Sequence, residues 1–188
     1  MTWAHSASLA CRLLAGTVFA VSFVSKVRGR KAWAAFATWF ASIPLRALGT
    51  KAAPIALAAA EAAVVVLVAI PATGAAGLVA GSALCLALTA GLALAVSRGA
   101  HEPCHCFGIS SEPPGRQQVT RNALLLAATV GGAVSTIAGG AGPSSPTPTG
   151  AVILAVTAGV TVAIMIIFSD DVVGLIRRAD ASSRERLP

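Results

Sequence analysis

Two long tracts of this 188-residue chain carry almost no charge, and they constrain the fold more than any other feature. Residues 52–97 hold a single charged side chain, Glu61, and residues 123–169 hold none. A helix needs about 20 consecutive apolar residues to cross the hydrocarbon core of a bilayer, and each tract is roughly twice that length. Turn-forming residues divide each tract, so each one predicts a pair of membrane-spanning helices.

With the apolar stretch near the N-terminus, these tracts predict five spans, at residues 7–27, 52–70, 74–97, 122–141 and 150–169. The composition agrees, because the chain is 56% hydrophobic and only 11% charged, whereas about a quarter of the residues of a soluble domain are charged. We therefore predict an all-α membrane protein with a single membrane domain over residues 1–176. A basic polar tail is predicted over residues 177–188.

A further segment, residues 32–44, is apolar but too short to cross a bilayer. It places Trp33, Phe36 and Phe40 at helical spacing. The pattern predicts a short interfacial helix whose rings lie at the level of the lipid headgroups. Arg12 and Lys26 lie near the two ends of the first span, where both are expected to extend toward the headgroups.

The formal charge of +7 indicates membrane orientation. Lys and Arg lie beside the apolar spans and not among exposed aromatic residues, which argues against nucleic acid and favours contact with anionic lipid. With five spans, thirteen of the fourteen basic residues fall on one face of the membrane. The positive-inside rule then predicts a multi-pass protein of the plasma membrane, with the N-terminus outside and the C-terminus and the loop at residues 98–121 in the cytoplasm.

That loop brings together Cys104, Cys106 and two histidines. A disulfide between Cys104 and Cys106 would close a small strained ring, and a strained disulfide is readily reduced. Arg121 and a protonated His105 favour the thiolate, which is the reactive form of cysteine. The spacing therefore fits a redox pair that takes part in thiol–disulfide exchange.

Metal binding is the alternative interpretation of the same loop. Nitrogen and sulfur ligands suited to zinc or copper would come from His101, Cys104, His105 and Cys106. Neighbouring residues seldom converge on one tetrahedral ion without a second ligand pair, and the sequence offers no such pair, so we assign no metal. The two cysteines within spans, Cys11 and Cys85, are expected to act as small apolar residues.

Glu61 lies near the middle of a predicted span, where a carboxylate is costly and is expected to face the interior of the bundle. Three roles are open for it: a proton relay coupled to thiol oxidation, a contact with a bound quinone, or a hydrogen bond to a neighbouring helix in its neutral form. No other cofactor is indicated. In the next span, Gly77 and Gly81 form a GxxxG pair that favours close approach of two helices.

The sequence Cys104-His105-Cys106-Phe107-Gly108, followed by Arg121-Asn122 at the start of an apolar span, resembles the signature of the MauE family. This family is related to DoxX-like membrane proteins. The residues from Phe23 to Lys26 and Glu61 also resemble the family pattern. The resemblance implies a membrane protein that assists maturation, processing or transport of the disulfide-rich small subunit of methylamine dehydrogenase. It also implies a thioredoxin-like partner, and Cys104 and Cys106 as the redox pair.

Two classes of function remain open at this stage, and a purely structural subunit is a third possibility. The chain is either a membrane component of thiol–disulfide oxidoreduction or a non-enzymatic assembly or transport factor, with metal binding by the loop as a variant of the second class. The two lines of inference differ on the side of the membrane. The family role implies that the cysteine loop lies on the outer face, whereas the distribution of charge predicts the cytoplasmic face.

Overall fold

The computed structural model describes residues 2–42, 52–97, 116–138 and 149–184, and within them every regular element is a helix. Five helices are long and apolar enough to cross a membrane, which confirms an all-α fold with five spans and one short extra helix. The elements are α1 (Thr2–Val27), α2 (Arg30–Ser42), α3 (Ala52–Ala69), the 3-10 helix η1 (Pro71–Thr73), α4 (Gly74–Ser97), α5 (Arg116–Ala138) and α6 (Thr149–Arg184).

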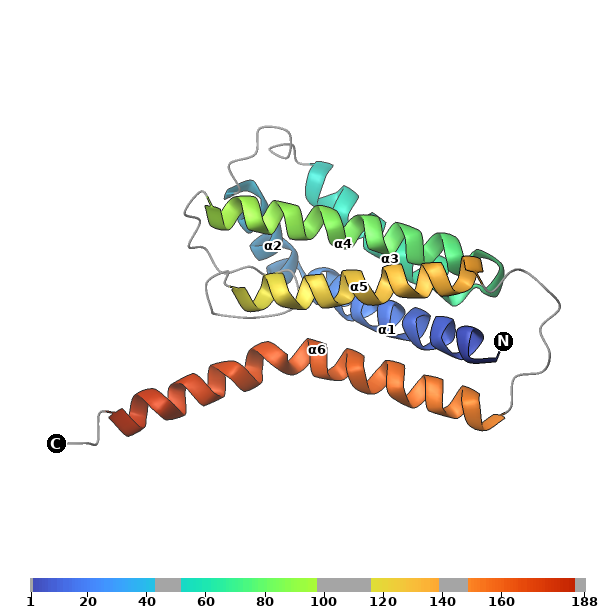
Figure 1. Ribbon diagram of the computed structural model, residues 1–188. Helices are drawn as coiled ribbons and strands as arrows, with labels where there is room; N and C mark the ends of the chain where they lie inside the picture. The colour runs from blue at the N-terminus through green and yellow to red at the C-terminus, as the bar shows by residue number, and fades with distance from the viewer. Residues whose placement is uncertain (1, 43–51, 98–115, 139–148, 185–188) are drawn as a thin grey trace.

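The long helices form a bundle in which α1 contacts each of the other α-helices (Figure 1). Helices α3, α4 and α5 pack around α1, and α6 lies along it. The core consists of buried apolar side chains from these helices: Leu14, Val18, Phe19, Val64, Val68, Leu78, Leu125 and Ala163. Many other apolar side chains, such as Leu154 and Met165 of α6, are exposed on the outside of the bundle, as expected of helices whose solvent is lipid.

The hairpin of α3 and α4 turns at η1, which begins with Pro71. A Cβ added at Gly77 of α4 would lie 2.7 Å from the backbone nitrogen of Val68 in α3. Only glycine allows the two backbones to come this close, which confirms the close approach predicted for the GxxxG pair. At Gly81 a Cβ would lie 3.4 Å from the side chains of Phe19 and Val64, an ordinary contact distance, so the steric requirement is at Gly77.

Two helices extend beyond the predicted spans. Helix α5 begins at Arg116, before the predicted start at residue 122, so Arg121 and Asn122 lie within the helix and not at its start. Helix α6 continues to Arg184 and includes most of the segment predicted as a polar tail. Its C-terminal end runs past the end of the bundle (Figure 1).

The short helix α2 is present, but its phenylalanine rings face the bundle. Phe36 is 1% exposed and Phe40 is 7% exposed. The centroid of the Phe36 ring lies 5.8 Å from that of Trp33 and 5.9 Å from that of Phe40. The two phenylalanine rings are therefore covered by protein. Helical spacing places the rings on one face, and that face packs against α1 and α3.

Candidate functional site

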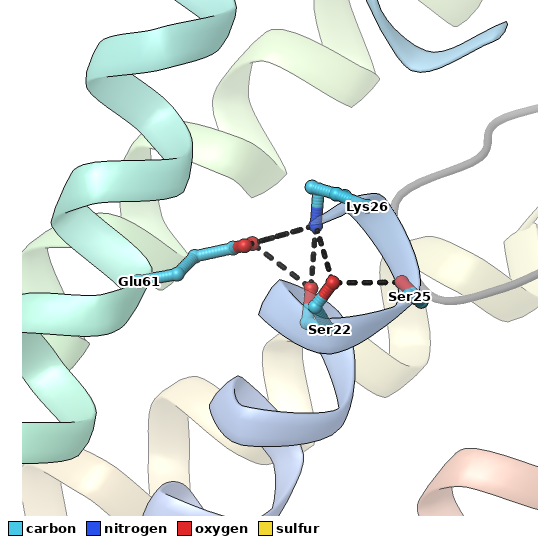
Figure 2. A network of polar contacts seen from close by, with 4 residues as sticks. All are labelled: Ser22, Ser25, Lys26 and Glu61. Atoms are coloured by element: carbon cyan, nitrogen blue, oxygen red, sulfur yellow. Dashed lines mark hydrogen bonds and ion pairs between the residues drawn. The ribbon is translucent and has the colours of Figure 1, made fainter. Parts of the chain in front are cut away.

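Glu61 of α3 forms a buried ion pair with Lys26 of α1 (Figure 2). The Nζ atom of Lys26 lies 2.9 Å from Oε1 and 3.0 Å from Oε2 of Glu61. Both side chains are 1% exposed. The expected contact of Glu61 with a neighbouring helix is present, but its partner is a cation.

The prediction that Lys26 extends toward the headgroups is therefore wrong. A side chain on an α-helix leans toward the N-terminus of that helix, which for Lys26 is the direction of the bundle interior. Glu61 lies in that direction and supplies a counter-charge, so the ammonium group has a partner without reaching water. The sequence contained a signal for this pairing, because Lys26 lies at the end of an apolar span and Glu61 is the only carboxylate in residues 1–101.

Ser22 links the two charged groups. It lies one turn before Lys26 on the same face of α1. Its Oγ accepts a hydrogen bond from Lys26 Nζ at 2.6 Å and donates one to Glu61 Oε1 at 2.9 Å. Lys26 also donates to the backbone carbonyl of Ser22 at 3.2 Å, and Ser25 Oγ donates to the same carbonyl at 2.7 Å. Acceptors are therefore in place for all three ammonium hydrogens.

Phe36 covers this network from α2. The Nζ atom of Lys26 lies 5.3 Å from the centroid of the Phe36 ring, within the range of a cation–π interaction. The network thus draws on three helices, α1, α2 and α3, and the Phe36 ring closes the site.

Helix α5 adds two buried polar residues at the same level. Ser8 Oγ lies 2.6 Å from Thr136 Oγ1, and a Cβ at Gly132 would lie 2.5 Å from Cβ of Cys11. These contacts show that α1 and α5 are antiparallel, and equal rise along both helices then brings Ser22 level with Arg121 and Asn122. Both of these α5 residues are buried. We call Ser22, Lys26, Glu61, Arg121 and Asn122 the polar layer.

Arg12 lies toward the other end of α1 and has a different environment. Its Nε and Nη2 atoms donate to the backbone carbonyl of Val68 at 2.9 and 2.7 Å. A Cβ added at Gly74 would lie 2.6 Å from Cζ of Arg12, so glycine at this position makes room for the guanidinium group. Arg12 thus satisfies a carbonyl in the last turn of α3, beside the turn that joins α3 to α4.

The chemistry of the network follows from its hydrogen bonds. A serine beside a lysine is the arrangement of a nucleophile and its general base. Here Glu61 stabilises the charged form of Lys26, and Ser22 donates its hydrogen to Glu61, so the arrangement does not support nucleophilic catalysis by Ser22. Moving the two charged groups from water into the protein interior costs roughly several kcal/mol per ion, even after the protein relaxes around them. A pair with this cost is weak evidence for stability and a reasonable candidate for function.

The predicted redox pair, Cys104 and Cys106, and the supporting His105 lie outside the described part of the chain. These three residues and His101, which also lies outside it, form the alternative metal site. Among the described residues, no group of three His, Cys, Asp or Glu side chains could hold a metal ion. Cys85 lies in the apolar core, and Cys11 packs at its edge. Both are free thiols, in keeping with their interpretation as small apolar residues.

The fold and the polar layer define a class, that of multi-pass helical membrane proteins with a buried charge pair at one end of the bundle. A sequence model of the family described as methylamine utilisation protein MauE matches residues 4–137. The chain therefore belongs to the MauE family. The match runs from α1 to α5, and includes Lys26, Glu61 and the positions of Cys104 and Cys106. No curated protein and no solved structure matches the chain.

Proposed function

We propose that this MauE-family protein is a membrane component of thiol–disulfide exchange, with Cys104 and Cys106 as the reacting pair. A thiolate of the pair attacks the disulfide of a thioredoxin-like partner and forms a mixed disulfide. The second thiolate then releases the partner as a dithiol and leaves a disulfide between Cys104 and Cys106. Two electrons and two protons pass from the pair to the partner, and the reverse direction uses the same steps. The substrate that the family resemblance implies is a disulfide-rich subunit under maturation.

The observation that carries this proposal is the position of the polar layer relative to the connection between α4 and α5. Gly74, at the start of α4, lies against Arg12, so α4 runs toward the end of the bundle that contains Lys26. Helix α5 starts at that end, since it is antiparallel to α1. Cys104 and Cys106 are in the segment that joins these two helices. The proposed redox pair is thus attached to the end of the bundle where the buried charges lie.

Supporting roles follow from charge and position. Arg121 and a protonated His105 would favour the thiolate of the attacking cysteine. Glu61 would act through Lys26, because their ion pair ties α1 to α3 and supports α2 at the same end of the bundle. In this proposal Glu61 is a positioning residue, and the exchange requires neither a metal nor a quinone.

Trapping of the mixed disulfide tests the proposal. We expect one of the single variants, Cys104→Ser or Cys106→Ser, to accumulate a covalent adduct with a thioredoxin-like protein that reductant removes. The double variant should give no adduct, and Cys85→Ser, which removes a core thiol, should behave like the unaltered protein. If neither single variant forms an adduct and the double variant leaves cellular thiol oxidation unchanged, the redox function is wrong.

We further propose that the protein lies in the plasma membrane with its N-terminus outside and the cysteine segment in the cytoplasm, as the distribution of charge favours. A membrane-impermeant maleimide tests this orientation in a Cys11→Ala/Cys85→Ala background, where only Cys104 and Cys106 remain. Labelling that requires permeabilised cells would support a cytoplasmic segment. Labelling of intact cells would instead place the pair on the outer face, as the family role implies.

A further inference from the structure

The corner between α1 and α2 carries three cations that point away from the bundle. Arg28, Arg30 and Lys31 are all exposed, and we call them the basic corner. Lys26 belongs to the same cationic run in the sequence, but it is buried and paired with Glu61. The structure thus separates one cation of the run from the other three.

The charge of the basic corner is not balanced by acidic residues of its own segment. The chain contains no Asp or Glu before Glu61, and Glu61 is paired with Lys26. Gly29 lies between the cations, and a Cβ placed there would meet nothing within 4 Å. The corner therefore combines three exposed cations with open space beside Gly29 among the described residues.

The three cations lie close together in the chain. Residues 28–31 are consecutive, and an extended chain spans at most about 3.6 Å per residue, so their Cα atoms lie within roughly 11 Å of one another. Arginine can donate two parallel hydrogen bonds to a phosphate, and the ammonium group of lysine adds a further charge-assisted bond. This chemistry suits the phosphate of a phosphodiester or of a free phosphate ion.

We propose that the basic corner binds the headgroup phosphate of an anionic phospholipid. The reason for choosing a lipid is the position of the corner in the chain. The membrane-spanning part of α1 ends at Val27, and Arg28 is the next residue, so the corner emerges at the level where lipid phosphates lie. Cationic side chains next to a span are attracted to anionic lipid there. This inference concerns a site outside the polar layer and does not depend on the proposed redox function.

The experiment measures binding of phosphatidylglycerol to the purified full-length protein in a neutral detergent, with phosphatidylcholine as the comparison lipid and native mass spectrometry as the readout. The variant Arg28→Gln/Arg30→Gln/Lys31→Gln should bind phosphatidylglycerol about a hundredfold more weakly, at roughly fivefold per cation. Added salt should weaken binding to the unaltered protein, because salt screens exposed charges. Melting temperatures of both proteins establish that the variant is folded.

A charge-matched control removes three cations elsewhere, as Arg177→Gln/Arg178→Gln/Arg184→Gln in α6. It should retain most of its affinity for phosphatidylglycerol. The proposal is overturned if the unaltered protein does not prefer phosphatidylglycerol to phosphatidylcholine, or if the control loses as much affinity as the corner variant. Displacement of the lipid by inorganic phosphate, at an ionic strength at which chloride does not displace it, would assign the corner to free phosphate and would also overturn the proposal.

Discussion

Helix α1 directs two cations toward α3, and the two sites differ in what receives the charge. Arg12 donates both of its hydrogen bonds to the carbonyl of Val68, a neutral backbone group near the end of a helix. Lys26 meets the carboxylate of Glu61, the hydroxyl of Ser22 and the ring of Phe36. Arg12 supplies a hydrogen-bond donor to a backbone carbonyl of α3. The pair of Lys26 and Glu61 instead places charges in the bundle that the fold does not require.

This difference separates a structural site from a candidate functional one. The carbonyl in the last turn of α3 lacks a partner within its own helix, so Arg12 satisfies a need that any helix end creates. Glu61 lies in the middle of its span, where a lone carboxylate is costly, so it requires a counter-charge. Substitutions at the two sites are therefore expected to change the unfolding free energy by different amounts.

The largest effect is expected for Glu61→Gln. Glutamine keeps the size of the side chain but leaves Lys26 as a buried ammonium without its counter-charge, which should cost about 3–5 kcal/mol of unfolding free energy. A denaturant titration in mixed micelles measures the loss, and Arg28→Gln, at an exposed site, is the control that should change little. A loss below about 1 kcal/mol would mean that Lys26 does not depend on Glu61.

Arg12→Gln should have an intermediate effect. The substitution removes the two hydrogen bonds to Val68 and should cost about 1–3 kcal/mol in the same titration, which is typical of an unsatisfied buried acceptor. Arg12→Lys should recover part of the loss, because a single donor suffices for a carbonyl. Equal losses for Arg12→Gln and Glu61→Gln would remove the distinction between the two sites.

Phe36→Leu should cost less, since leucine fills much of the same volume. The loss of the cation–π contact alone is worth about 0.5–2 kcal/mol. The measurement is a double-mutant cycle with Lys26→Met/Glu61→Leu, in which the cation is absent. A coupling energy close to zero would show that the ring covers the site without interacting with the charge.

The smallest effect on stability is expected for Lys26→Met/Glu61→Leu. Well-packed apolar residues can replace a buried ion pair, so the unfolding free energy should stay within about 1 kcal/mol of the unaltered protein. Trapping of the mixed disulfide should nevertheless fall if the pair positions the end of the bundle for exchange. If this stable variant forms as much mixed disulfide as the unaltered protein, the ion pair has only a structural role.

The arrangement of spans could be predicted because it depends on local properties of the sequence. Long uncharged tracts and the break at Pro71 specify the helices, and a carboxylate in a span predicts an inward orientation. Gly77 was likewise informative, since its spacing from Gly81 indicates close packing. These features do not depend on which helices become neighbours.

The sequence marks Lys26 and Glu61 as unusual charges in or beside apolar spans, but it does not decide that they pair, because pairing depends on tertiary packing. Lysine at the end of a span can reach water or turn inward, and only the antiparallel contact of α1 with α3 decides between these. The aromatic face of α2 has the same ambiguity, because spacing defines a face but not what it packs against. Cys104 and Cys106 lie outside the described residues, so their role remains the proposal drawn from spacing and family resemblance.

The most direct test asks whether Glu61 is a carboxylate held by Lys26. A hydrophobic carbodiimide modifies a carboxyl group in apolar surroundings only when that group is protonated. Phe36→Ala admits the reagent, and Lys26→Met in that background removes the counter-charge, so a buried Glu61 should take up a proton. Mass spectrometry should then find Glu61 modified in Phe36→Ala/Lys26→Met and unmodified in Phe36→Ala. Equal modification in the two proteins would contradict the ion pair.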